Sequence, residues 1–524
     1  MRSQKTRFVP VRLSLKDIAG GGYVDALVEA HAALRFDAGL PAGSLARKMF
    51  RQQVAQRVDF FPWGFQQRLL ELLPAVGTSI ARPLIKSAAG ASTIGFNAAT
   101  KTHQAPLSGL GYFRVAENGV LYFTAKSEHY HAPLGHYFPG YDLIKIARNL
   151  GVPNATHNNT RGHLTRLLEE ALVRAAAGLG EDDARYARLL SAKSPATPNR
   201  VLNLETGSLA AEAALKMVLA RFYKPQPDSI APKYTGRVPV IIVIGDVDGG
   251  FNANYHGTTM LTQFMRGMWN ELREGMEREQ LYVIRRVSPN DRAGLDSIFS
   301  EYDTGKHKIA AVFHEIVLMN YAGKLLDKKF VRHLYRLAKK HDVPVVVDEI
   351  QTGIWSPELF MFREYGVKPT FIAIGKGFPG GEYCASRILF SSEYDNLPQF
   401  GALVTNGQEE LASLAYLVTM RWAQANAEVT SAVGEYYESR LRELAARHKD
   451  KVAAIEGRRH LAGVYFHELP PARAFAETLN RCGFDISVQT YKAGCPPSAL
   501  TKLPLIAGYE AVDLLLECMG DALG

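Results

Sequence analysis

Two charged side chains follow two consecutive apolar runs of this sequence. The run VVVDEIQTG (345–353) carries Asp348, and the next run, FIAIGKGFPGG (371–381), carries Lys376. A buried carboxylate needs a cationic partner because burying a lone charge is costly. A protonated pyridine ring is such a partner, and opposite charges about 4 Å apart attract by about 4 kcal/mol at an effective dielectric near 20. Taken alone, the Asp-Glu pair is equally typical of a metal ligand or a helix cap.

The lysine has the surroundings of a nucleophile. Lys376 lies between two glycines after an apolar strand. Desolvation there lowers the pKa of the amine, as formation of a Schiff base requires. A surface lysine on a loop is the alternative, but it does not explain an Asp and a Lys at the ends of consecutive strands.

A third segment has the character of an anion site. NLETGSLAAEAALKMVLARFY (203–223) indicates a strand end, a glycine turn and a helix. Thr206, Gly207 and Ser208 offer backbone N–H groups and hydroxyls at the helix N-terminus, where anions bind. Thr and Ser are also favoured as ordinary caps, so the signal is open to both interpretations.

The elements that position these residues alternate along the chain. Near-continuous apolar runs at 237–246, 308–317, 343–350 and 370–376 are typical of parallel strands buried on both faces. Helical stretches at 208–222, 290–300 and 328–341 lie between them, which predicts a doubly wound α/β domain with ligands beyond the carboxyl ends of its strands. We expect a large α/β domain over 106–405 and a smaller C-terminal α+β domain over 406–524.

The first part of the chain is basic. Residues 1–101 contain 14 Lys/Arg and 6 Asp/Glu, and apolar residues recur at helical spacing in 22–35 and 43–58. We expect a mostly helical N-terminal extension over 1–105. It is either a solvated, charged segment or a surface for an acidic partner. The aromatic stretch DFFPWGFQQRLLELLP (59–74) either packs on the core or docks a partner or a membrane surface.

Composition narrows the class of protein. The four cysteines share no CxxC spacing, so we expect neither a metal site nor disulfides. No apolar run reaches the roughly 18 residues of a membrane span, and no signal-peptide core is recognisable, so we expect a cytoplasmic protein. No nucleic-acid-binding motif accompanies the net charge of +9.

Together these segments resemble the class III aminotransferases (ornithine, acetylornithine, GABA and lysine-ε type) of pyridoxal-5′-phosphate (PLP) fold type I. The most specific stretches are DEIQTG (348–353) and LFMFREYGVKPTFIAIGKG (359–377). The resemblance implies that Lys376 holds PLP as a Schiff base, that Asp348 pairs with the ring nitrogen and that Gln351 contacts the ring hydroxyl. Thr206, Gly207 and Ser208 would hold the phosphate.

Further segments are similar to family motifs. In NYHGTT (254–259), Tyr255 would stack on the ring, with His256 beside it. In ALVTNGQEELASLAYL (402–417), Thr405 would reach the partner subunit's phosphate site, which implies a homodimer with active sites at the interface. The segment before LGH (134–136) lines the substrate pocket in the family, so the implied pocket residues are Lys126, Glu128, His129, Tyr130 and His131.

Three departures from the family pattern concern the substrate. Glu315 is kept in FHEIVLMNYAG (313–323) as a cofactor-site residue, but Asn320 replaces the Glu that engages a switching Arg, which argues against glutamate as amino donor. Trp355 is placed near the cofactor rim. Lys502 is the nearest cation where many members carry an Arg for the substrate carboxylate, and Lys is a poorer bidentate clamp.

We therefore predict a PLP-dependent aminotransferase that acts on an unusual amine or amino acid. The alternative on the same scaffold is a lyase, a decarboxylase or a racemase, which would use the same Lys and Asp. A non-catalytic binding or scaffold protein is disfavoured, since it has no reason to keep Lys376, Asp348 and Gln351 together.

Overall fold

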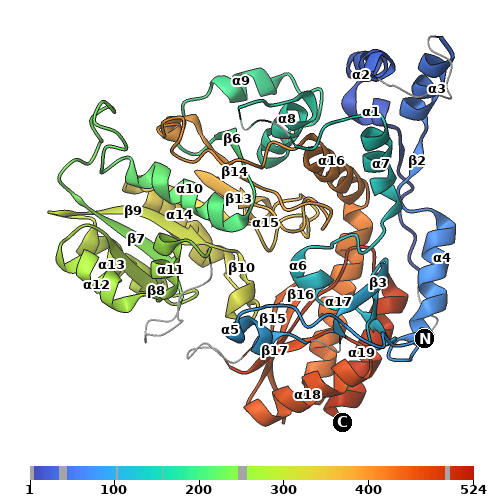
Figure 1. Cartoon of the computed structure of the whole chain (residues 1–524). Coiled ribbons are helices and arrows are strands. Elements are labelled where there is room, and N and C mark those ends of the chain that lie inside the picture. Colours follow the sequence, from blue (N-terminus) through green and yellow to red (C-terminus); the bar gives the residue numbers. More distant parts are fainter. Residues whose placement is uncertain are drawn as a thin grey trace.

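A seven-stranded sheet forms the centre of the molecule (Figure 1). The computed structural model describes residues 5–34, 44–101, 104–155, 157, 159–245, 256–489 and 496–524. The sheet order is β6-β14-β13-β12-β9-β7-β8. All neighbours are parallel except β14, which is antiparallel to both of its partners. Its strands are β6 (Pro198–Leu204), β7 (Val238–Ile244), β8 (Val283–Val287), β9 (His307–His314), β12 (Val345–Asp348), β13 (Phe371–Ile374) and β14 (Ser386–Ser391).

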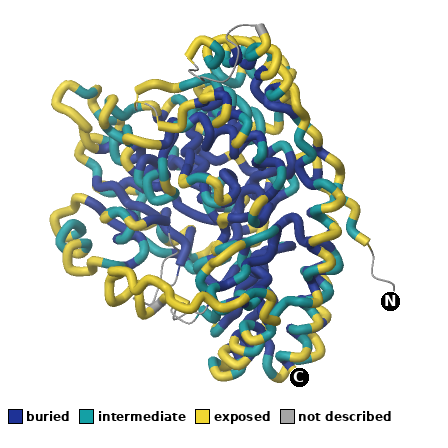
Figure 2. Tube along the Cα trace, turned by 45° about the vertical axis from the view of Figure 1, so that its right-hand side comes forward, coloured by how far each residue is buried: buried dark blue, intermediate teal, exposed yellow. Residues whose placement is uncertain are grey.

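The sheet is buried on both faces. In β7, Ile241 and Val243 belong to one apolar cluster, whereas Val240 and Ile242 belong to another on the opposite face. This is why the strand sequences are apolar without alternation. The predicted mostly parallel α/β sheet is confirmed, and Figure 2 shows its strands as a dark, buried interior.

Helices connect and cover these strands. Three predicted helices are present as α10 (Gly207–Leu219), α13 (Arg292–Tyr302) and α14 (Lys328–Lys340), each within three residues of the predicted ends. No helix of the described residues is long and apolar enough to cross a bilayer. The other helices of this part of the chain are α6 (Ser127–Tyr130), α7 (Asp142–Asn149), α8 (His163–Ala177), α9 (Arg185–Ser191), α11 (Met260–Arg266), α12 (Asn270–Arg278), α15 (Met361–Glu364) and α16 (Glu410–Ala425).

A second, antiparallel sheet lies in the C-terminal part of the chain. It has the order β15-β16-β18-β17, with strands β15 (Val452–Arg458), β16 (Leu461–Phe466), β17 (Ser487–Gln489) and β18 (Ser498–Lys502). The long helix α17 (Ala427–Arg447) leads into it, and α18 (Leu469–Arg481) and α19 (Tyr509–Leu523) pack beside it. The smaller pairings involve β3 (Pro106–Leu110), β4 (Phe113–Ala116), β5 (Leu121–Phe123), β10 (Val317–Leu318) and β11 (Lys324–Leu325).

The N-terminal segment packs on the rest of the chain. Its elements are α1 (Leu15–Ala19), α2 (Gly21–Leu34), α3 (Ser44–Ala55), α4 (Trp63–Leu72), α5 (Ile94–Ala99) and the short strands β1 (Arg12–Leu13) and β2 (Val58–Asp59). The ring of Phe61 lies 5.9 Å from that of Trp422 in α16 and 6.1 Å from that of Phe138. Thr6 accepts a hydrogen bond from the N–H of Tyr509 in α19. The aromatic stretch 59–74 therefore contributes to the core, while the predicted domain boundaries at 105 and 405 stay predictions.

Glu349 fixes the turn that follows β12. Its carboxylate accepts hydrogen bonds from the Thr352 hydroxyl at 2.5 Å and from the N–H of Phe362 at 2.8 Å. The strand ends at Asp348, two residues short of the predicted run, because the Asp348 side chain accepts the N–H of Ile350 and starts the turn. Burial raises the pKa of Glu349 to about 7.

Replacing Phe61 by Ala should lower the free energy of unfolding by about 3 kcal/mol, because a buried ring is lost from an aromatic cluster. Trp63, two residues away, is 60% exposed, so Trp63→Ala should cost less than about 0.5 kcal/mol. Denaturant unfolding of both variants measures the difference. If Phe61→Ala lowered the free energy of unfolding as little as Trp63→Ala is expected to, the N-terminal segment would not be part of the core.

Glu349→Gln should flatten the pH dependence of stability. The native pKa lies above the ordinary value of 4.5, so the folded state holds the proton more tightly and wild-type stability falls as the pH rises from about 4.5 through about 7. Gln keeps the acceptor oxygen but does not titrate. Denaturant unfolding at pH 5 and pH 8 measures the slope, with Glu358→Gln on the same loop as the control. An unchanged slope in Glu349→Gln would contradict the assignment.

Candidate functional site

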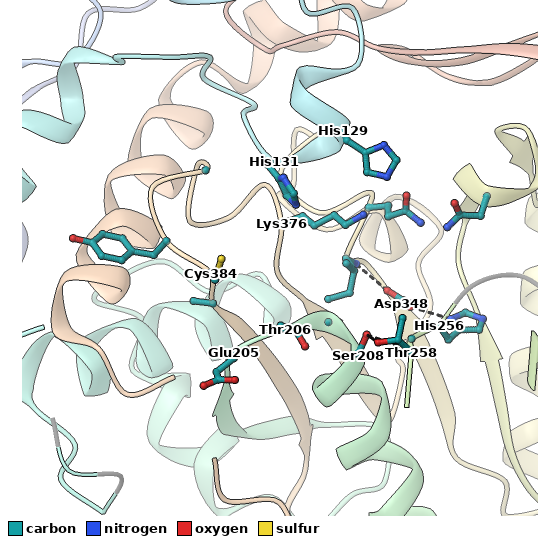
Figure 3. Close-up of a pocket in the computed structure, with 18 of the residues that line it drawn as sticks. His129, His131, Glu205, Thr206, Ser208, His256, Thr258, Asp348, Lys376 and Cys384 are labelled. Atoms are coloured by element: carbon teal, nitrogen blue, oxygen red, sulfur yellow. Dashed lines mark hydrogen bonds and ion pairs between the residues drawn. The ribbon is translucent and has the colours of Figure 1, made fainter. Parts of the chain in front are cut away.

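A cavity of about 720 Å³ opens where β12 and β13 end and α10 begins. Figure 3 shows His129, His131 and Lys376 on one side of Asp348, with Thr206, Ser208 and Thr258 on the other. The cavity lies beyond the carboxyl ends of parallel strands, where α/β sheets bind ligands. The sequence-predicted residues that line it are Thr206, Gly207, Ser208, His256, Asp348, Gln351, Lys376, His129, His131 and Asn320.

Asp348 is a buried carboxylate with both oxygens engaged. It is 4% exposed; its Oδ2 lies 2.9 Å from Nδ1 of His256, and its Oδ1 accepts the N–H of Ile350 at 3.0 Å. The other ring nitrogen of His256 is buried without a hydrogen-bond partner among the described residues. This arrangement orients the carboxylate and leaves it suited to a cationic group in the cavity.

Lys376 follows β13, the parallel neighbour of β12. Its φ of 36° lies in the left-handed region, which is costly for a side-chain-bearing residue and is typical of functional sites. Burial lowers the pKa of its amine, while the charges of Glu315 and Asp348 oppose that shift. The Nζ atom lies 5.2 Å from the centre of the Tyr130 ring. The amine is thus desolvated, as a nucleophilic lysine requires.

Gln351 and Glu315 form a polar pair beside these residues. The side-chain amide of Gln351 donates to Oε1 of Glu315 at 3.2 Å, and Glu315 is fully buried. Oε1 of Gln351 is buried without a hydrogen-bond partner within the described ranges. Since orphaned buried acceptors are rare, this oxygen is available to a donor on a ligand.

The N-terminus of α10 forms an anion cradle. Thr206 caps the helix, and a Cβ at Gly207 would come within 2.8 Å of the Ile350 side chain, which would have to shift to make room for it. The hydroxyls of Ser208 and Thr258 lie 3.1 Å apart, and the N–H of Thr258 donates to Ser208 at 3.1 Å. Hydroxyls and free backbone N–H groups at a helix N-terminus are the donors that a phosphate accepts.

A left-handed turn forms the opposite wall. Ser127, Glu128, His129 and Tyr130 have φ of 46°, 49°, 55° and 78°. Burial, together with the charge of Lys376, lowers the pKa of His129 to about 3, and the same two causes lower the pKa of His131. Both imidazoles are therefore neutral at physiological pH.

Four predicted pocket residues lie behind the cavity wall. Glu128 pairs with Arg114 and with His136 at 2.8 Å, and Lys126 donates to Ser487 at 2.6 Å while burial lowers its pKa to about 8. Besides Lys502, the predicted pocket residues that do not line the cavity are Lys126, Glu128, Tyr130 and Trp355.

The remaining predicted residues have different positions. Lys502 is buried and donates to the backbone carbonyl of Gln351. Thr405 is exposed on the loop before α16 and does not line this cavity, and Tyr255 lies outside the described residues. Among the described residues, no group of three or more His, Cys, Asp or Glu side chains is placed to hold a metal ion.

Sequence reasoning missed part of the lining. Thr258 belongs to NYHGTT (254–259). Its hydroxyl contact with Ser208 could not be predicted, because the two residues are 50 positions apart in the chain. The loop Gly381–Ala385, Glu205 and Arg266 also line the cavity. The loop follows Lys376 directly and could have been proposed from that position; the packing of α11 that brings Arg266 to the rim left no signal.

The donor set fits PLP. The cradle at α10 suits a phosphate, Asp348 suits a protonated ring nitrogen, and the orphaned Gln351 oxygen suits a ring hydroxyl. Lys376 supplies the amine that an aldehyde requires.

Comparison with known proteins agrees with this chemistry. The family model for aminotransferase class-III matches residues 171–522. The chain is 28% identical over 264 residues to 5-aminovalerate aminotransferase DavT of Pseudomonas aeruginosa, covering 48% of this chain and 57% of that protein. It is 26% identical over 298 residues to adenosylmethionine-8-amino-7-oxononanoate aminotransferase of Mycobacterium leprae, covering 54% and 62%. The chain thus spans less than two thirds of the length of these relatives.

Solved structures share the fold. Adenosylmethionine-8-amino-7-oxononanoate aminotransferase from Methanocaldococcus jannaschii superposes with a TM-score of 0.64 at 17% identity, covering 87% of this chain and 99% of that one. Ornithine aminotransferase from Plasmodium yoelii gives 0.61 at 16% identity, covering 88% and 98%. The fold is PLP fold type I, and because the family model matches well over half of its length, the chain belongs to the aminotransferase class-III family.

Proposed function

We propose that this protein is a PLP-dependent aminotransferase that takes the amino group from a primary amine or amino acid and passes it to a carbonyl acceptor. The observation that carries the proposal is the pairing of Lys376 and Asp348 at the ends of adjacent parallel strands, above the anion cradle of α10. Family membership supports the same reaction class.

The chain offers a separate contact for each part of the cofactor. Thr206, Gly207, Ser208 and Thr258 would hold the phosphate, Asp348 the ring nitrogen and Gln351 the ring hydroxyl. When bound, PLP supplies an aldehyde that reacts with amines and a ring that withdraws electrons from the substrate carbon. The Asp348 carboxylate keeps the ring nitrogen protonated, because opposite charges in a buried site raise the pKa of the base.

Lys376 has two duties in this proposal. Its amine would hold the cofactor covalently, and Nζ of Lys376 would also be the general base that accepts the proton from the substrate carbon. The burial that lowers the pKa of Lys376 favours the neutral, proton-accepting amine. Neutral His129 and His131 line the same cavity as this amine.

The assembly is proposed from the family resemblance. Thr405 is exposed and outside its own cavity, which suits a residue that serves the phosphate site of a second copy in a homodimer. Five arginines of the N-terminal segment form ion pairs within it, namely Arg12, Arg47, Arg51, Arg57 and Arg68. An acidic partner for that segment would have to compete with these pairs.

The proposal is tested by single turnover of the purified holoenzyme with a panel of primary amines and no acceptor, followed by absorbance. Conversion of the bound cofactor to its pyridoxamine form by an amine supports amino transfer. Substrate consumption with the aldehyde form retained would overturn it in favour of a lyase, a decarboxylase or a racemase.

Lys376→Ala should abolish covalent attachment of the cofactor, because Lys376 is the lysine that lines the cavity among the described residues. Borohydride reduction followed by peptide mass spectrometry should label Lys376 in the wild type and nothing in the variant. Two other lysines lie near the cavity, the partly buried Lys126 and the buried Lys502. A reduced adduct on either of them in the wild type would show that the nucleophile is misassigned.

Asp348→Asn should lower kcat on the order of 10³-fold, since about 4 kcal/mol of charge pairing is lost. The fold should persist, because Asn keeps the shape and the acceptor oxygen for Ile350. Asp342→Asn is the matched control: Asp342 precedes the other end of β12 and pairs with Arg221. A kcat within twofold of wild type in Asp348→Asn would exclude its pairing with the ring.

A further inference from the structure

Lys502 is a fully buried lysine at a junction of three segments. It ends β18, its N–H donates to the carbonyl of Ala125 at 2.8 Å, and its carbonyl accepts the hydroxyl of Ser127 at 2.6 Å. The C-terminal sheet is thereby joined to the start of the left-handed turn. The side chain of Lys502 extends from this point toward the turn that follows β12.

An aromatic cage encloses the amine. Its Nζ lies 3.5 Å from the ring centre of Trp355 and 4.6 Å from that of Tyr130, and it donates to the carbonyl of Gln351. The indole N–H of Trp355 is fixed on the carbonyl of Leu503 at 2.9 Å, so the cage has little freedom to turn. The two rings and the carbonyl therefore surround an amine that has no contact with solvent.

The amine of Lys376, the proposed nucleophile, lies near the same Tyr130 ring. Nζ of Lys376 lies 5.2 Å from its centre. A shift of Lys502 would therefore move both the ring against which Lys376 packs and the backbone that aims the Gln351 side chain into the cavity. Two groups proposed to contact the cofactor depend on one buried side chain.

We infer that Lys502 is a positioning residue, which holds Gln351 and Tyr130 in place for the cofactor and Lys376, and is not a cation that binds a substrate carboxylate. The inference rests on the proposed PLP-dependent function. Lys502 does not line the cavity, and its amine is directed at a carbonyl and two rings. Burial, with the nearby charge of Lys376, also lowers the pKa of Lys502 well below its ordinary value, which weakens any pairing with an anion.

Two substitutions separate the two roles. Lys502→Met keeps the length of the side chain but removes the donor. Lys502→Arg keeps a cation and would improve a carboxylate clamp, because guanidinium binds carboxylates with two hydrogen bonds. In a fully buried site, however, its larger head group forces the neighbouring groups to shift. Lys308→Met is the matched control: Lys308 is another buried lysine, hydrogen-bonded to Asp303 at 2.6 Å at the start of β9.

The experiment measures cofactor affinity by absorbance titration of the apoenzyme with PLP, and kcat/KM with ornithine and with 1,4-diaminobutane, which differ only in a carboxylate. Positioning predicts that Lys502→Met and Lys502→Arg both weaken PLP binding on the order of tenfold, with the ratio of the two kcat/KM values unchanged within twofold. Lys308→Met should change stability but not PLP affinity.

A selective loss of activity with ornithine in Lys502→Met, restored by Lys502→Arg, would overturn the inference and make Lys502 a carboxylate clamp. PLP affinity equal to wild type in both variants would overturn it as well. If the wild type transfers no amino group, the proposed function fails, while the titration still decides whether Lys502 positions the cofactor site.

Discussion

The structure depends on placing two opposite charges in an apolar interior. Asp348 and Lys376 end adjacent parallel strands of a sheet covered on both faces, so neither is solvated as a free side chain would be. Such charges are tolerated only with partners that stay in place. His256 and the N–H of Ile350 contact Asp348, and the charge of Glu315, which accepts a hydrogen bond from Gln351, acts on Lys376. The rigid sheet fixes the positions, and the loops supply the chemistry.

The sheet and the central residues were predictable from sequence because they have local signals. Continuous apolar runs identified β7, β9, β12 and β13. Asp348 and Lys376 were found because they lie at the ends of the last two of these runs. Thr206, Gly207 and Ser208 were found because caps and glycine turns are short-range features. The ends of the elements shifted by a few residues, since a side-chain contact such as Asp348 with Ile350 decides where a strand stops.

The pocket walls were less predictable, because they depend on contacts between distant segments. Lys126 and Glu128 are close to His129 in sequence, yet Glu128 pairs with Arg114 and Lys126 donates to the hydroxyl of Ser487. Lys502 was expected at the substrate because it is the nearest cation where many family members carry an Arg, and the two aromatic rings beside its amine are about 150 and 370 residues away in the chain. No periodicity or spacing reports such an enclosure.

The left-handed turn of residues 127–130 has a consequence for how the protein is assembled. Left-handed backbone costs roughly 1–2 kcal/mol per residue, so an isolated segment would not hold this shape. Contacts from two other segments hold this turn. Arg114 in β4 forms ion pairs with Glu128 and, at 3.1 Å, with Asp485, and the carbonyl of Lys502 accepts a hydrogen bond from the hydroxyl of Ser127. The wall that carries His129 therefore depends for its shape on contacts from the C-terminal part of the chain. The chemistry at the strand ends and the shape of the pocket thus rest on different parts of the sequence.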